Sequence, residues 1–284
     1  MCPDDPVLAR CRGKERASVI FALRRVRSWL AGCVVAAAAA AGFATSAFAA
    51  SDASATSAAA VARPARFEDT MAQRVLACTG CHGREGHAAP DGYYPRIAGK
   101  PAGYLFNQLR NFRDQRRHYA LMNGLLEFLD DDYLREIAAH FASLDLPYPP
   151  PMAPVGTAAQ RDAGEALVRR GDAARGIPAC NDCHGAQMTG RAPFIPGLLG
   201  LPRDYLNAQL GAWRSGQRRA QPPDCMAMVA LRLSPEDIGA VSSWLAAQPV
   251  PTPSAAPVDP QARLPLACGG VVDAPVAAAS GPLR

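Results

Sequence analysis

The chain is poor in aromatic residues, which make up 7% of it, and it lacks any run in which polar and apolar residues alternate. Without that alternation, a sheet with one solvated face is excluded as the main architecture. Residues 1–49 hold seven basic and three acidic side chains, so the remainder carries a net charge of about +1. This balance gives no indication of nucleic-acid binding, which requires a concentrated basic surface.

One long apolar run, "WLAGCVVAAAAAAGFATSAFAA" at residues 29–50, follows a cluster of arginines. Basic, then apolar, then small residues is the order of a secretory signal peptide, and Ala47-Phe48-Ala49 supplies the cleavage pattern. We therefore predict a signal peptide at 1–49 and a periplasmic location. Residues 1–18 are unusually polar for a signal, which places the expected translation start further in. The apolar run is too short to predict a membrane span.

The sequence "LAGC", which ends at Cys33, resembles a lipoprotein cleavage box. Arg27 lies six residues before Cys33 and leaves almost no apolar segment ahead of it. Ordinary cleavage near Ala50 is therefore favoured over a lipid anchor at Cys33.

The chain contains an internal repeat, in which segments of a first copy recur about a hundred residues later. "ACTGCHG" at 77–83 recurs as "ACNDCHG" at 179–185, "PRIAG" at 95–99 as "PGLLG" at 196–200, and "YLFNQLRNFR" at 104–113 as "YLNAQLGAWR" at 205–214. Further on, "MNGLL" from Met122 aligns with "MAMVA" from Met226. One structural unit is therefore used twice.

Proline-rich and low-complexity segments separate and flank the two copies, and such composition predicts linkers and tails. The predicted organisation is a signal peptide at 1–49, a low-complexity linker at 50–65, a first repeat domain at 66–146, a Pro-rich linker at 147–157, a second repeat domain at 158–248 and a Pro-rich, disordered tail at 249–284.

Apolar residues within each copy follow a helical period. Leu105, Leu109 and Phe112 share one face of such a helix, as do their counterparts in the second copy. Further helices are predicted at 66–77 and 159–171, ahead of each cysteine pair. The fold class is therefore all-α, with two tandem domains of three to four helices each.

Few aromatic side chains and few helices give each copy a poor apolar core, which a large apolar cofactor would complete. Both copies contain Cys-x-x-Cys-His, the attachment motif of c-type haem. These residues are Cys78, Cys81 and His82 in the first copy, and Cys180, Cys183 and His184 in the second. We predict two covalently bound haem c groups, with the cysteines bonded to the porphyrin and the histidines bound to iron.

Three other interpretations of the cysteine pairs fit less well. A zinc site needs four ligands close together, whereas these pairs lie about a hundred residues apart, each with an extra histidine. A thioredoxin-like pair belongs in a βαβ unit, which the helical pattern lacks. A disulfide between such close neighbours is strained.

Methionine is predicted by elimination as the other axial ligand of each iron. In the second copy His184 is the only histidine, and Lys100 is the only lysine after the signal peptide. The repeat pairs Met226 with Met122, so these two are the predicted ligands. Met228 has no partner in the first copy, and Met188 lies too close to His184 in sequence to reach the opposite face. In the first copy, the alternatives His87, His118 and His140 stay open.

These motifs make the two copies similar to class I cytochromes c, and their tandem order resembles the di-haem cytochrome c4 family. The resemblance covers about residues 66–248 and rests on the two haem motifs, the "PRIAG" and "PGLLG" loops, the middle helices and the two methionine segments. The Pro-rich tail departs from the family pattern, as does "DDD" at 130–132 in place of the usual helix start.

The resemblance implies an electron carrier, not an enzyme, since His/Met ligation leaves no open position on the iron. The implied partners are a quinol-oxidising complex or a dehydrogenase as donor and a terminal oxidase as acceptor, with no nucleic acid and with loose membrane association left open. The alternative is a cytochrome subunit or haem enzyme, either like a di-haem peroxidase or thiosulfate-oxidising, with one substrate-accessible iron.

The family also implies roles around the haem. The carbonyl groups of Pro95 and Pro196 would accept the other ring N–H of the iron-bound histidine, fixing its tautomer. Arginines near the end of the middle helix would neutralise haem propionates, and these are Arg113 and Arg117, matched by Arg214 and Arg218.

Two cysteines outside the signal peptide belong to neither haem motif. Cys225 directly precedes Met226, and Cys268 lies in the Pro-rich tail. Leftover thiols in an oxidising compartment usually pair. We predict a Cys225–Cys268 disulfide that ties the tail across the haem-ligand loop of the second copy, against the alternative of two unpaired thiols.

Overall fold

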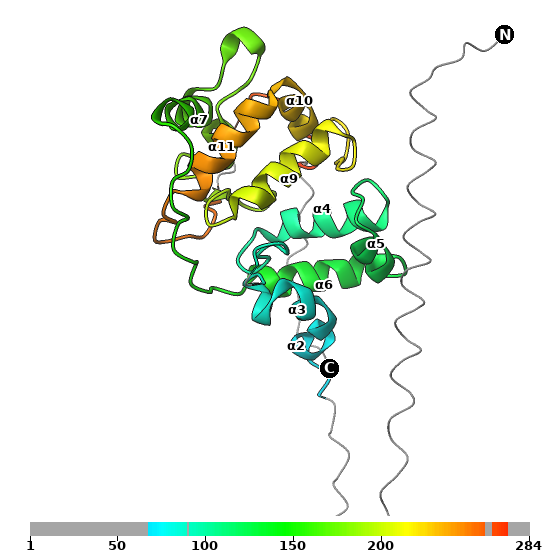
Figure 1. Ribbon diagram of the computed structural model, residues 1–284. Coiled ribbons are helices and arrows are strands. Elements are labelled where there is room, and N and C mark those ends of the chain that lie inside the picture. Colours follow the sequence, from blue (N-terminus) through cyan, green and yellow to red (C-terminus); the bar gives the residue numbers. More distant parts are fainter. Residues whose placement is uncertain (1–67, 90, 259–262, 272–284) are drawn as a thin grey trace, which may run out of the picture. The chain divides into compact units, whose positions relative to one another are not determined.

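The computed structural model describes residues 68–89, 91–258 and 263–271. These form two mostly helical repeats, the first repeat at 68–146 and the second repeat at 158–248, with a linker between them (Figure 1). The predicted signal peptide and the linker at 50–65 lie outside the described residues. Among the helices of the described ranges, none has the length and apolar character needed to cross a membrane.

The first repeat consists of short and long helices in alternation. In chain order they are α2 at Met71–Arg74, α3 at Leu76–His82, a 3-10 turn at Arg84–Gly86, α4 at Ala102–Arg113, α5 at Ala120–Leu126 and α6 at Asp131–Ala142.

The second repeat ends in three helices like those of the first, but its 3-10 turn precedes the helix with the cysteine pair, and it adds a small hairpin. Its elements are α7 at Ala158–Arg170, a 3-10 turn at Ala173–Arg175, α8 at Cys180–His184, β1 at Gly190–Arg191, β2 at Ile195–Pro196, α9 at Arg203–Arg214, α10 at Cys225–Arg232 and α11 at Pro235–Ala246. The strands pair antiparallel, with Gly190 opposite Pro196.

The helices are more numerous than the predicted three to four per domain. The predicted helix at 66–77 is instead split at Val75, and its second half, α3, continues through the cysteine pair to His82. The methionine segments also form helices of their own, α5 and α10. Elements this short have too few turns to show a clear period in the sequence.

Side-chain caps begin the long helices that close each repeat. Ser234 caps α11 by accepting a bond from the amide of Asp237, and Pro235 lies in the first turn, where a proline is well tolerated. At the aspartate run of the first repeat, Asp130 accepts a bond of 2.8 Å from the amide of Tyr133. The departure from the usual helix start therefore keeps a working cap.

Each repeat has its own apolar core. In the first, α4 packs on α6 around Leu105, Leu134 and Phe141. In the second, α11 packs on α7 and α9, and the core includes Val168 and Leu245. Helices α7 and α11 approach each other closely at Gly164 of α7, where an added Cβ would lie 2.3 Å from the carbonyl oxygen of Ala240.

The two repeats pair through equivalent segments. Arg117 and Arg218 form an isolated antiparallel bridge. On either side of it, the amide of His118 donates to the carbonyl of Gln217, and the amide of Arg219 donates to that of Arg116, both at 2.8 Å. Because the paired residues occupy matching places in the repeat, this contact is locally two-fold symmetric.

Side chains extend this symmetry. The amide oxygen of Gln108 accepts bonds from Arg117 at 2.9 Å and from Arg218 at 3.0 Å. The matching oxygen of Gln209 accepts from Arg218 at 2.9 Å and from Arg117 at 2.6 Å. Arg218 is buried, and burial together with the charge of Arg117 lowers its pKa. Among the described residues, no carboxylate forms an ion pair with either arginine.

Part of the segment predicted as a disordered tail has a defined place in the structure. Val258 forms a parallel bridge with Ala192. Residues 263–271, which we call the C-terminal strap, lie against the second repeat, where the amide of Gly269 donates to the carbonyl of Pro223 at 2.9 Å. The prolines of this segment lack the amide N–H groups that a helix needs. Backbone hydrogen bonds and the Cys225–Cys268 disulfide hold the segment in place instead.

We expect Gly164→Ala to lower the free energy of unfolding of the haem-loaded protein by about 1–3 kcal/mol, because the added methyl forces α7 away from the backbone of α11. Gly239→Ala in α11 is the matched control, since its Cβ would meet nothing within 4 Å. It should raise stability by up to about 1 kcal/mol through helix propensity. Denaturant unfolding followed by circular dichroism measures both, and a similar loss in the two variants would contradict the packing argument.

Candidate haem sites

Each cysteine pair lies on a short helix that ends at the histidine. Helix α3 carries Cys78 and Cys81, and the glycine after His82 has a φ of 77°. An added Cβ on Gly83 would lie 2.2 Å from the carbonyl oxygen of Ala88. Helix α8 ends in the same way, at Gly185 with a φ of 83°. The glycine that follows each haem motif is therefore required for the sharp turn after the histidine.

The two histidines make the same hydrogen bond. Nδ1 of His82 lies 2.8 Å from the carbonyl oxygen of Pro95, and Nδ1 of His184 lies 2.8 Å from that of Pro196. A carbonyl can only accept, so Nδ1 carries the proton in both rings. Burial lowers the pKa of both histidines and outweighs the proline carbonyl, which raises it. Each ring is thus neutral, with the lone pair of Nε2 left to bind a metal.

The four motif cysteines are unpaired. Burial raises the pKa of Cys180 to about 12 and also raises the pKa of Cys78 and Cys183. A thiol-exchange pair needs a lowered pKa, because the thiolate is the attacking species. The environment of these cysteines therefore argues against a thioredoxin-like activity.

The predicted methionines occupy matching helices. Met122 lies in α5, half-buried against the first core, and Met226 lies half-buried in α10. Met228 is also half-buried in α10, so burial alone does not separate it from Met226. Met188 is buried in the second core, in the loop that follows α8.

The alternative histidines of the first repeat lie elsewhere. His118 is exposed, and so is His87, whose ring bonds the carbonyl of Arg84 in the adjacent 3-10 turn. His140 lies in α6 with its ring edge on Phe141, at 5.2 Å between centroids. None of the three is as deeply placed as His82.

A tyrosine cluster surrounds the histidine of the first repeat and was missed by the sequence analysis. The ring of Tyr94 lies 6.1 Å from that of His82, at a steep angle. The hydroxyl of Tyr119 donates to that of Tyr94 at 3.3 Å. Ile195 stands in place of Tyr94 in the second repeat, so the repeat comparison contained the difference between the two sites.

The four predicted propionate arginines divide into two kinds. Arg113 pairs with Asp114 and Asp131, and Arg214 donates to backbone carbonyls beside α10. Only Arg117 and Arg218 come together at the contact between the repeats, with no acidic partner in the described part of the chain. Their glutamine partners, Gln108 and Gln209, were missed, although both fall in the repeated "YLxxQL" segment.

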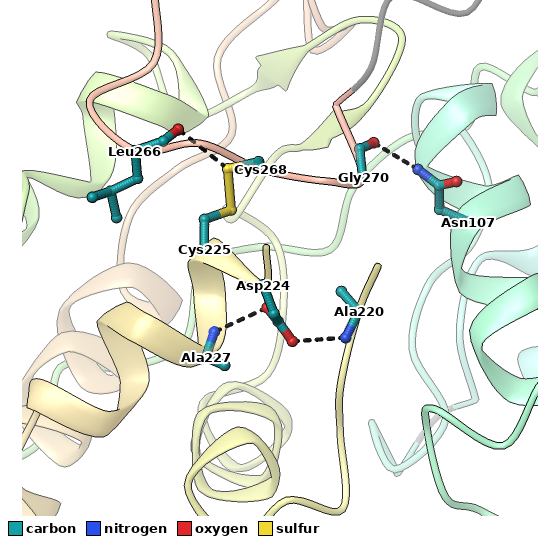
Figure 2. Close-up of a disulfide and its surroundings, with 8 residues drawn as sticks. All are labelled: Asn107, Ala220, Asp224, Cys225, Ala227, Leu266, Cys268 and Gly270. Carbon is teal, nitrogen blue, oxygen red and sulfur yellow. Dashed lines mark hydrogen bonds between the residues drawn. A yellow bond between two sulfur atoms is a disulfide. The ribbon is translucent and has the colours of Figure 1, made fainter. Parts of the chain in front are cut away.

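The predicted disulfide is present. Cys225 and Cys268 are bonded at the start of α10, and Figure 2 shows the strap passing across that helix end. Asp224 caps the helix by accepting from the amide of Ala227 at 3.0 Å. Beyond the disulfide, the carbonyl of Gly270 accepts a bond of 2.8 Å from Asn107 of α4, so the strap reaches the first repeat.

The donor set suits c-type haem. Each repeat offers two free thiols three positions apart, a neutral buried imidazole oriented by a carbonyl, and a thioether on a separate helix. The pair formed by buried Arg218 and half-buried Arg117, which has no carboxylate partner in the described part of the chain, offers positive charge to the acidic groups of such a cofactor.

Comparison with known proteins agrees with this chemistry. The chain is 41% identical over 182 residues to the thiosulfate dehydrogenase electron acceptor of Thiomonas intermedia (strain K12), covering 64% of this chain and 83% of that protein. It is 37% identical over 174 residues to cytochrome c4 of Pseudomonas aeruginosa, covering 61% and 84%. No family model matches the chain.

A solved structure shows the same fold. The crystal structure of reduced recombinant cytochrome c4 from Pseudomonas stutzeri matches with a TM-score of 0.54 and 32% identity, over 62% of this chain and 95% of that one. The all-α class is thereby confirmed, and with it two haem c groups and a role in electron transfer instead of enzymatic catalysis. The chain belongs to the cytochrome c4 family of di-haem electron-transfer proteins.

Proposed function

We propose that this protein is a periplasmic carrier that takes single electrons from a dehydrogenase or a quinol-oxidising complex and passes them to a terminal oxidase. The observation that carries the proposal is the repeated histidine geometry, with Nδ1 donated to a proline carbonyl at 2.8 Å in both repeats. When bound, the haem iron supplies a centre that accepts and releases one electron.

The attachment residues in this proposal are Cys78 and Cys81 in the first repeat and Cys180 and Cys183 in the second. Their thiols are unpaired, and each pair lies on one helical turn, with the histidine next in sequence. His82 and His184 hold the iron, and the carbonyls of Pro95 and Pro196 keep each ring in one tautomer.

Met122 and Met226 are the proposed opposite ligands. Met122 is the third residue of α5, and Met226 is the second residue of α10. Each of these short helices packs on the middle helix of its own repeat, α5 on α4 and α10 on α9. A thioether on each iron favours the reduced form more than a second imidazole would, which suits a carrier between a donor and an oxidase.

Arg117 and Arg218 are the proposed partners of haem propionates. Each guanidinium is held by glutamine oxygens from both repeats, which are neutral acceptors and leave the positive charge uncompensated. Carboxylates would satisfy that charge at the contact between the repeats. The same residues would bring the acidic edges of both cofactors to one place.

A relative indicates which donor to test first. The protein from Thiomonas intermedia is named as an electron acceptor of thiosulfate dehydrogenase. We expect the haem-loaded protein to be reduced by a thiosulfate dehydrogenase in the presence of thiosulfate, with both haems reduced. Absorption spectroscopy follows the reaction, and a protein that neither this enzyme nor a quinol-oxidising complex reduces would contradict the proposal.

We expect Met226→Ala to convert the second haem to a high-spin form that binds external ligands, because no other side chain takes the vacated position. Met228→Ala, on the same helix, should leave it low-spin. The oxidised absorption spectrum tests this, since the weak long-wavelength sulfur-to-iron band should lose half its intensity only in Met226→Ala. If Met228→Ala loses the band instead, Met228 is the ligand and the repeat alignment is wrong by two positions.

We expect Arg218→Met to lower the reduction potential of the haem-loaded protein by on the order of 50 mV, since removing a buried cation favours the more positive, oxidised iron. Arg219→Met is the control, because that side chain is exposed and pairs only through its backbone amide. Spectroelectrochemical titration compares them. Equal shifts in both variants would show that Arg218 acts only through general surface charge.

A further inference from the structure

Helix α5 of the first repeat presents an apolar face to solvent. Leu121 is 64% exposed, Leu125 is 43% exposed, and Phe128 in the turn after the helix is 89% exposed. By the helical period, these three lie opposite the buried residues Asn123 and Leu126. They therefore form one surface, the α5 face, which points away from the core of its own repeat.

Acidic residues without basic partners lie beside this face. Glu127 and Asp130 are exposed, and neither forms an ion pair among the residues that the structure describes. Asp130 uses its carboxylate to cap α6. The α5 face is thus apolar with an acidic rim, and it lies on the same short helix as the proposed ligand Met122.

The second repeat has changed every one of these positions. In the alignment that pairs Met122 with Met226, Leu121 corresponds to Cys225, Glu127 to Leu231 and Phe128 to Arg232. An acid and an aromatic ring have been replaced by an apolar side chain and a cation. The two repeats therefore present different chemistry at the same place in the fold.

Leu121, which is exposed in the first repeat, corresponds to Cys225 in the second repeat, and the strap is attached at Cys225. Cys225 bonds Cys268 there, and the strap backbone packs so closely that a Cβ on Gly269 would lie 2.1 Å from the carbonyl oxygen of Pro222. Earlier in the strap, Arg263 and Pro265 line a pocket together with Asp182 of α8.

The strap therefore runs from the attachment helix α8 to the methionine helix α10. These are the two helices that supply the proposed ligands His184 and Met226. The strap therefore covers part of the surface of each of these two helices.

We propose that a redox protein with an apolar contact surface and a basic rim docks on the α5 face of the first repeat, and that the strap keeps it off the equivalent face of the second. The proposal rests on the proposed function as a carrier and names the surface that it uses. One electron leaves the reduced partner, which is oxidised by one, and the haem protein is reduced by one, with no proton transferred. Opposite charges at the rim speed and orient the encounter.

The test uses a basic blue copper protein as probe, because its copper absorption is separate from that of haem. Stopped-flow spectroscopy gives the second-order rate constant for electron exchange with the haem-loaded protein. We expect Phe128→Ser to lower it about tenfold, as for a central contact residue. Leu231→Ser is the control, since Leu231 is a large apolar side chain that is 62% exposed on α10 of the second repeat, and it should change the rate less than about twofold.

Binding gives a readout that does not depend on electron exchange. With both proteins reduced, backbone amide shifts of the labelled haem protein should change around residues 119–132 on addition of the probe. Changes centred on α10, or a larger rate loss in Leu231→Ser than in Phe128→Ser, would overturn the docking surface. So would sedimentation of the free protein as a dimer that Phe128→Ser dissociates, since a second copy would then occupy the face.

The strap is tested by opening it in the Phe128→Ser background. Adding Cys225→Ser with Cys268→Ser should restore part of the lost rate and extend the amide shifts to α10, whereas no recovery would overturn the shielding role. These outcomes are separate from failure of the proposed function. A protein that thiosulfate dehydrogenase cannot reduce, yet that binds the probe on α5, would refute the assigned donor and leave the surface intact.

Discussion

The hydrogen bond from Nδ1 of the motif histidine to a proline carbonyl is the interaction on which each repeat depends. It joins the end of the attachment helix to the loop that leads into the middle helix, and it does so at 2.8 Å in both repeats. It also fixes the tautomer, because a carbonyl cannot donate. The glycine after each histidine belongs to the same arrangement, since its positive φ turns the chain back toward that loop.

The contact between the repeats is built around two arginines and two glutamines. Buried Arg218 and half-buried Arg117 lie together with only neutral partners, and burial and like charge both disfavour the charged form of Arg218. Such a cluster is costly in an isolated protein and becomes favourable when anions join it. We therefore expect the arginine network to be stable in the haem-loaded protein, where the acidic groups of the cofactors would lie beside it at the contact between the two repeats.

Duplication supplied two similar sites, and later changes made them unequal. The first repeat has tyrosines around its histidine and an open apolar face on α5. The second has lost the tyrosine next to the histidine and carries a covalently tied strap instead. An electron carrier must meet different proteins, and unequal surfaces on equivalent sites allow one route for exchange with partners and another for transfer within the molecule.

The sequence by itself determined the chemistry. Cys-x-x-Cys-His occurring twice, the scarcity of other histidines and lysines, and the alignment of Met122 with Met226 predicted two haems and their ligands, because covalent attachment and iron binding depend on residue type and short spacing. Periodicity predicted the long helices, because packing repeats every turn. The disulfide was also within reach, since two cysteines outside the predicted signal peptide belong to neither haem motif and export to an oxidising compartment was expected.

Only the tertiary structure decided which groups meet. The hydrogen-bond network between the repeats joins residues that are far apart in the sequence, namely Arg117, Arg218, Gln108 and Gln209. It forms only when the two repeats pair. The strap reads as disordered because proline composition describes local preference, whereas a long-range bond and the packing of Gly269 hold it in place. Contacts between distant segments depend on how whole elements dock, and no local pattern in a single sequence encodes that.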